Sequence, residues 1–338
     1  MRTTIEVKPT QPINPSIVQQ RKHQPTINKQ ERLFLKKIIY FPALLLTAVL
    51  LVILMPTTGF CWGPMSHIDL ATEVLNYSQL LVPQIMELIK NFPYDFLYGN
   101  IGADIVIGKN LTDYEYHCHN WLVANQIFKS AKNDHQKAFA YGYISHLAAD
   151  VIAHNYFVPT MIVSMHRKRI FPHSYWEMRF DKLVENKVIK IIEETFRFRH
   201  KDDNELLKNT LEKTILSFST NKNIFNGIMF VNRKRILRNM LNGLTSDRKW
   251  KFSQKQFEMY RLYSIDAIFD VLNTGDKSVY TKFDPTGIEI IDIAMQIRKQ
   301  LNRLYKHKNV LKEDMNLITQ HILPEFPPNL YSNYKSTR

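Results

Sequence analysis

The feature that most constrains the fold is a long apolar stretch in the middle of the chain, between Asp134 and Pro159. When this stretch is wound at 3.6 residues per turn, apolar side chains lie on nearly every side, as expected of a helix buried in a core. We therefore predict a core helix that is capped by Asp134, runs to Phe157 and ends at Pro159. The apolar positions are Phe139, Ala140, Tyr143, Ile144, Leu147, Ala148, Val151 and Ile152.

The remainder of the chain after residue 61 also has helical periods and almost no strand alternation. This predicts an all-α body, a multi-helix bundle. Ser66 and Asp69 have the spacing of a helix cap, and Pro83 separates that first helix from a second apolar stretch at 85–89. Further helices are predicted near 119–131, 174–198, 204–218, 252–273, 286–306 and 309–322.

The composition excludes several classes of protein. The 338 residues include only 10 glycines, and no glycine-rich phosphate-binding motif is present. Two cysteines are too few for a disulfide scaffold or a four-cysteine metal site. The net charge is +14, of which the first 61 residues contribute +6, with eight basic and two acidic side chains.

The first 61 residues have the pattern of a targeting segment. Residues 1–37 are polar and basic without a sustained apolar period, which predicts a disordered cytoplasmic leader. Residues 38–55 are apolar and uncharged, and Gly59 and Cys61 are small residues suitably placed for cleavage before Trp62. Residues 38–61 are therefore predicted to be a signal-peptide core, or a membrane anchor if they are not cleaved. Either way, the rest of the chain is expected to be exported across the cytoplasmic membrane, as a secreted or periplasmic protein after cleavage.

Ionisable side chains interrupt the apolar core helix at a regular spacing. His146, Asp150 and His154 are four residues apart, so an α-helix projects all three from one face. Burying three such groups without partners is costly, and a metal ion removes that cost because imidazole and carboxylate are its natural ligands. The alternative is two hydrogen-bonded core histidines and a hydrogen-bonded aspartate.

Other candidate ligands lie on both sides of this helix. His173 and Glu177 are again four residues apart, although an ordinary helix N-terminus would also explain them. Of His117 and His119, only one is expected to face the cluster. Cys118, which lies between them, is expected to be a buried, inert thiol. Asp104 lies in a stretch that resembles a loop, where it is either a ligand or a helix cap.

Taken together, these residues resemble the superfamily of zinc-dependent phospholipases C and S1/P1 nucleases. A mature chain that begins with Trp62, the Trp62-to-His67 spacing and the 15-residue separation of Asp104 and His119 all match its pattern. The pair His146 and Asp150 and the pair His173 and Glu177, each four residues apart, match this pattern as well. The fit is closest to the bacterial zinc-dependent phospholipase C-like branch, including the stretches 93–100 and 140–150. One difference is that His154 follows Asp150 by four residues, where well-known members have six.

The resemblance implies an all-α phospholipase C/P1 nuclease-like bundle with up to three zinc ions per chain. One zinc would be held by Asp104, His119, His146 and Asp150, a second by His154, His173 and Glu177, and a third by Trp62, His67 and a bridging Asp150. Asp104 would also act as the catalytic base. Residues 62–200 would be the catalytic core, and residues 201–338 a helical C-terminal extension of unknown role.

The implied reaction is hydrolysis of a phosphodiester by zinc-activated water. A phospholipid or membrane surface is the expected substrate, because the branch resemblance and delivery at a membrane favour it. Nucleic acid is the alternative, since a basic protein attracts both polyanions. A non-catalytic, membrane-anchored metal-binding module is a second alternative. No obligate protein partner is implied.

Overall fold

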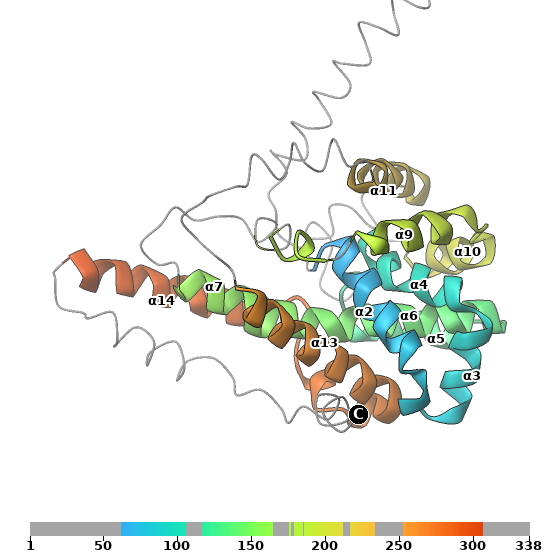
Figure 1. The fold of residues 1–338 in the computed structure, drawn as a ribbon, viewed down its shortest axis with the longest axis horizontal. Helices are drawn as coiled ribbons and strands as arrows, with labels where there is room; N and C mark the ends of the chain where they lie inside the picture. Colours follow the sequence, from blue (N-terminus) through green and yellow to red (C-terminus); the bar gives the residue numbers. More distant parts are fainter. Residues whose placement is uncertain are drawn as a thin grey trace, which may run out of the picture. The chain divides into compact units, whose positions relative to one another are not determined.

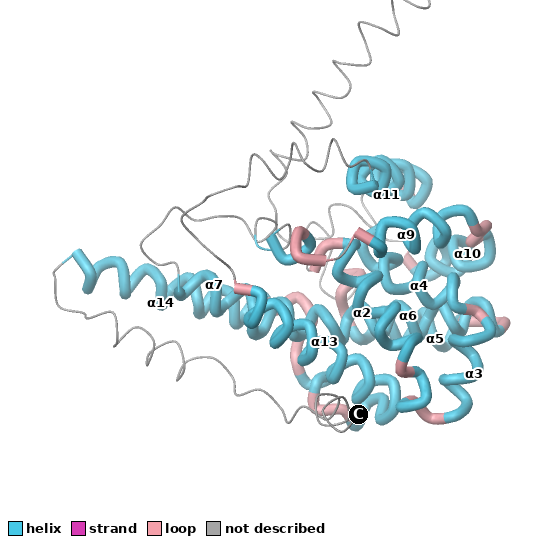
Figure 2. The backbone as a smooth tube through the Cα atoms, in the orientation of Figure 1, coloured by secondary structure: helices cyan, strands magenta, loops and turns pink. Residues whose placement is uncertain are grey.

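The computed structural model describes residues 62–105, 117–164, 176, 179–184, 186–211, 217–233 and 253–306, all within one unit, Thr57–Arg338 (Figure 1). These residues form helices joined by loops and turns, and no strand occurs among them (Figure 2). The all-α prediction is therefore confirmed. The predicted leader and signal or anchor segment, 1–61, and the predicted helix 309–322 lie outside the described residues.

The predicted core helix is α6 (Asp134–Ile152), which lies in the middle of the bundle. Because α6 is apolar on all sides, it needs neighbours on all sides. These neighbours come from both halves of the body: α2 (Pro64–Asn76), α4 (Pro93–Gly102), α5 (Trp121–Ser130) and α13 (Gln254–Thr274).

The core helix does not end where the sequence predicts. After Ile152 the chain forms a π-helical turn, Ala153–Phe157, and then continues as α7 (Val158–Ser164). Pro159 is the second residue of α7 and directly follows this turn, where the hydrogen-bond pattern of the helix changes and Val158 donates to the Ala153 carbonyl. The prediction that the helix stops at Pro159 is therefore wrong.

Two predicted helix starts are also wrong. The side chain of Asn133 accepts a hydrogen bond from the Gln136 amide (2.9 Å), so Asn133 caps α6 in place of Asp134. Helix α2 begins at Pro64 with Gly63 as its N-cap, which leaves Ser66 inside the first turn. Asparagine and aspartate have the same capping chemistry, so the sequence pattern does not distinguish between neighbours.

Helix α4 crosses α6 with backbone against backbone. A Cβ atom on Gly99 would lie 2.0 Å from the Phe139 carbonyl oxygen, and one on Gly142 would lie 2.1 Å from the Phe96 carbonyl oxygen. Only glycine permits this approach. The stretch that the sequence presents as a loop is the end of α4 followed by a 3₁₀ turn, Ala103–Ile105, so Asp104 is delivered on a rigid element beside α6.

The remaining helices surround this pair. Helix α13 packs on α6 and α2, and α14 (Ile288–Lys306) packs on α7, so residues beyond 200 contribute directly to the core. The predicted helix 174–198 is not continuous, because a turn at 182–184 precedes α9. The other helices are α3 (Pro83–Asn91), α9 (Lys187–Arg197), α10 (Lys201–Thr210) and α11 (Phe218–Arg233).

No helix within the described ranges is long and apolar enough to cross a bilayer. The segment predicted to act as a signal or anchor is outside those ranges.

Candidate metal centre

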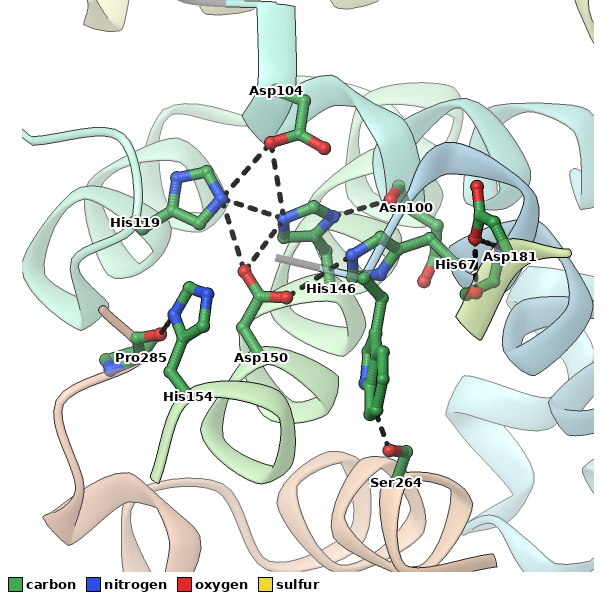
Figure 3. A network of polar contacts seen from close by, with 12 residues as sticks. His67, Asn100, Asp104, His119, His146, Asp150, His154, Asp181, Ser264 and Pro285 are labelled. Carbon is green, nitrogen blue, oxygen red and sulfur yellow. Dashed lines mark hydrogen bonds and ion pairs between the residues drawn. The ribbon is translucent and has the colours of Figure 1, made fainter. Parts of the chain in front are cut away.

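The centre is built on α6, where His146 and Asp150 lie one turn apart and are fully buried. His146 Nδ1 lies 2.7 Å from the carbonyl oxygen of Asn100 on α4 (Figure 3). A carbonyl oxygen only accepts, so Nδ1 carries the proton and Nε2 turns an electron pair toward Asp150. A histidine that binds a metal is held in this way by its second nitrogen.

Four donor atoms converge beside Asn100. His119 Nε2 lies 3.3 Å from Asp104 Oδ1, 3.2 Å from Asp150 Oδ2 and 3.0 Å from His146 Nε2. His146 Nε2 lies 3.1 Å from Asp150 Oδ2 and 4.0 Å from Asp104 Oδ1. Ligands that are 2.0–2.2 Å from a tetrahedral zinc ion are about 3.3–3.6 Å from one another. Four of these five separations, 3.0–3.3 Å, are close to those of zinc ligands, and the fifth, at 4.0 Å, is longer.

His67 approaches the same aspartate from the other side. Its ring, on α2, stacks on His146 with centroids 3.8 Å apart, and its Nε2 lies 3.3 Å from Asp150 Oδ1. The two oxygens of Asp150 thus face different histidines, as a carboxylate that bridges two metal ions does.

Buried polar atoms of this cluster lack hydrogen bonds. Both ring nitrogens of His67 and both oxygens of Asp150 are buried without one, although they lie at ion-pair distances from neighbouring donors. Such atoms are costly in a protein interior unless they have a partner. A metal ion would be that partner, because the electron pairs of its ligands point at a common centre instead of at one another.

The charge states also suit a metal. Burial, together with the neighbouring His146, lowers the pKa of His67 to about 4, so the ring is neutral at pH 7 and has an electron pair to donate. Burial alone would raise the pKa of Asp150, but His146, His119 and His67 lower it well below its usual range. A neutral imidazole and an ionised carboxylate are the forms that bind zinc.

His154 lies beside this cluster in Figure 3, on the π-helical turn. Its Nδ1 is 2.7 Å from the carbonyl oxygen of Pro285, which leaves Nε2 as the nitrogen able to bind a metal. The loop reaches this position because Gly287 has a φ of +58° and because a Cβ there would lie 2.6 Å from the His154 backbone. π-Helical turns are frequent at functional sites.

Trp62 is fully buried at the start of the described chain. Its indole lies between Phe157 and Phe180, with ring centroids at 4.8 Å and 3.7 Å, and its Nε1 donates to Ser264 Oγ at 3.2 Å. The backbone at Trp62 is thereby fixed close to the first turn of α2, which carries His67.

Asp181 holds that first turn. Its carboxylate accepts hydrogen bonds from the backbone amides of Met65 (3.3 Å) and Ser66 (2.9 Å), and from the Ser66 hydroxyl. A remote aspartate thus provides the capping that the sequence pattern assigns to Ser66 and Asp69. It positions the helix that presents His67.

Replacing Asp181 by alanine is expected to loosen this turn. Loss of a capping carboxylate lowers the free energy of unfolding by about 1–2 kcal/mol, and loss of a positioning contact lowers metal affinity by about 10–100-fold. Urea unfolding and zinc titration measure the two effects. Asp276→Ala, which removes an exposed carboxylate, serves as the control. Unchanged zinc affinity in Asp181→Ala would contradict the assigned role.

The predicted ligands fall into three groups. His67, Asp104, His119, His146 and Asp150 are brought together, and His154 lies beside them (Figure 3). Trp62 is anchored separately by Phe157, Phe180 and Ser264. His173 and Glu177 lie outside the described residues. Of the two neighbouring histidines, His119 faces the cluster, while His117 Nδ1 accepts a hydrogen bond from the His119 amide (3.1 Å) and so shapes the turn.

Sequence reasoning missed the groups that orient these ligands. They are the backbone carbonyls of Asn100 and Pro285 and the side chains of Asp181 and Ser264. A carbonyl oxygen has no signature in a sequence. Asp181 and Ser264 are about 115 and 200 residues from their partners, so no local spacing reveals them.

Comparison with known families agrees with this geometry. The family model described as zinc dependent phospholipase C matches residues 66–225. Residues 66–225 are therefore similar to the zinc-dependent phospholipase C family, and the resemblance seen in the sequence is confirmed. No curated protein and no solved structure was found to match the chain.

Proposed function

We propose that this protein is a zinc-dependent phosphodiester hydrolase that acts on phospholipids. The observation that carries the proposal is the buried cluster of four donors, Asp104, His119, His146 and Asp150, at separations close to those of zinc ligands, within the region that matches the zinc-dependent phospholipase C family. Bound zinc supplies Lewis-acid catalysis, because it draws charge from the phosphate oxygens and makes water a stronger nucleophile near neutral pH.

The residues of the chain have distinct roles in this proposal. His146 and His119, with Asp150, would hold one zinc through Nε2 and a carboxylate oxygen. Asp150 and His67, with the amine and carbonyl of Trp62, would hold a second, and His154, His173 and Glu177 a third. Asp104 would act as the general base. It is the most exposed of the four donors, at 4%.

A free amine at Trp62 requires cleavage after Cys61. We therefore propose that the segment 38–61 directs export and is then removed. N-terminal sequencing of the protein purified from membrane and soluble fractions tests this step. Trp62 as the first residue is the expected result, and an intact leader in active protein would contradict it.

The substrate is tested by incubating the zinc-loaded protein with phosphatidylcholine vesicles and, separately, with single-stranded DNA. We expect release of diacylglycerol and phosphocholine, and loss of this activity with a chelator and recovery on adding zinc. Cleavage of DNA alone would overturn the phospholipid assignment in favour of a nuclease. Inactivity on both, with fewer than two zinc ions per chain, would leave only a non-catalytic module.

A further inference from the structure

We infer that Asp95, His200 and Asp203 form an additional zinc site, which ties the start of α4 to the start of α10. Asp95 lies in the first turn of α4, His200 is the N-cap residue of α10, and Asp203 lies in its first turn. Asp95 precedes Asp104 by nine residues, roughly 13 Å along a helix, so this cluster is separate from the candidate metal centre.

The donor atoms are spaced as zinc ligands are. His200 Nδ1 lies 3.1 Å from Asp203 Oδ2 and 3.5 Å from Asp95 Oδ1, and one donor atom from each of the three residues lies within 4.8 Å of the others. Edges of a zinc tetrahedron are about 3.3–3.6 Å. The cluster thus repeats the spacing of the candidate metal centre.

The orientation of the His200 ring favours a cation. Its Nε2 lies 2.9 Å from the carbonyl oxygen of Thr195, so Nε2 carries a proton and Nδ1 faces two carboxylates. Burial alone would lower the pKa of His200, but Asp203 and Asp95 raise it to about 9, so Nδ1 presents a proton to the carboxylates unless a metal ion takes its place. Backbone carbonyls hold His146 and His154 in the same way, although there the carbonyl faces Nδ1 and the nitrogen left for the metal is Nε2. Histidines that bind metals show this second hydrogen bond.

One carboxylate of the cluster, that of Asp203, is only partly hydrogen-bonded. Asp203 is 1% exposed, and its Oδ1 is buried without a hydrogen bond. Within the described residues, no lysine or arginine pairs with Asp95 or Asp203. Burial and the nearby Asp95 raise the pKa of Asp203 to about 6. Two close carboxylates with one imidazole between them therefore carry an excess of negative charge that a divalent cation neutralises.

The site has a supporting group and an opening. His135 Nδ1 lies 2.9 Å from Asp95 Oδ2, which orients the carboxylate so that Oδ1 faces His200. The Asp95 side chain is 16% exposed and that of His135 is 56% exposed, so solvent reaches the cluster from this side. Three protein ligands and one water complete a tetrahedral zinc site.

Zinc analysis of the full chain tests the inference. The wild type, Asp203→Asn and Asp95→Asn are equilibrated with the same free zinc concentration, and bound zinc per chain is measured. Each variant is expected to bind one zinc fewer than the wild type. Asp202→Asn removes the neighbouring exposed carboxylate and is expected to leave the count unchanged. Asp95 is partly exposed, so its variant is informative even if Asp203→Asn does not fold.

An unchanged count in both variants would overturn the inference and identify His200 as an imidazolium between two carboxylates. The two proposals fail in different ways. Asp150→Asn removes zinc from the candidate metal centre and is expected to leave this additional zinc bound. If the wild type binds a single zinc that is lost in Asp203→Asn but kept in Asp150→Asn, this site stands and the proposed hydrolase centre does not.

Discussion

Replacing Asp150 by asparagine is expected to abolish hydrolysis and to release zinc from the candidate metal centre. Asp150 faces His119 and His146 with one oxygen and His67 with the other, so its loss affects two metal positions together. Even a change to a residue that only supports a ligand lowers activity or metal affinity by about 10–100-fold, so loss of this ligand is expected to exceed about 100-fold. Hydrolysis rate and zinc per chain are the measurements.

Asp134→Asn is the matched control. Asp134 lies on the same helix, and its side chain is 59% exposed, so this substitution makes the same chemical change outside the site. It is expected to keep full activity and full zinc content. His146→Ala is expected to behave like Asp150→Asn. Activity retained in both Asp150→Asn and His146→Ala, with normal circular dichroism, would mean that the site lies elsewhere.

Replacing Gly142 by alanine is expected to destabilise the bundle and to weaken zinc binding at the same time. The new Cβ would lie 2.1 Å from the Phe96 carbonyl oxygen and 3.0 Å from Gly99 Cα, which are backbone atoms that move only with α4 itself. Overpacking of this kind costs about 1–3 kcal/mol. Because α4 carries the Asn100 carbonyl and leads into Asp104, a displaced α4 also disturbs the metal ligands.

Urea unfolding measures the stability change, and zinc titration measures the effect on the centre. Gly227→Ala is the matched control, because Gly227 is also helical and a Cβ there would meet nothing within 4 Å. That variant is expected to be unchanged or more stable by about 0.5–1 kcal/mol, since alanine loses less backbone entropy on folding. Equal stability of Gly142→Ala and the wild type would contradict the close crossing of α4 and α6.

The spacing of residues along the chain was sufficient to predict features that lie within one helix. The apolar period identifies α6 as the core helix, and the four-residue interval places His146 and Asp150 on one face, because helix geometry depends only on neighbouring residues. The same reasoning failed at helix ends. The cap at Asn133 depends on one side-chain hydrogen bond, and the start of α2 depends on the remote Asp181. The continuation past Pro159 depends on a π-helical turn that periodicity does not register.

The sequence by itself determined the all-α class, the family resemblance and the types of residue in the metal cluster, since these follow from residue identity and local period. Only the tertiary structure decided how the cluster is assembled. It brings His67 from α2 to one oxygen of Asp150, and His119, which precedes α5, to the other. The glycine-mediated crossing of α4 and α6 brings Asp104, just after α4, toward the same cluster. It also places the Asn100 and Pro285 carbonyls on ring nitrogens of His146 and His154. Contacts between residues far apart in the chain depend on packing of whole helices, which no spacing along the chain encodes.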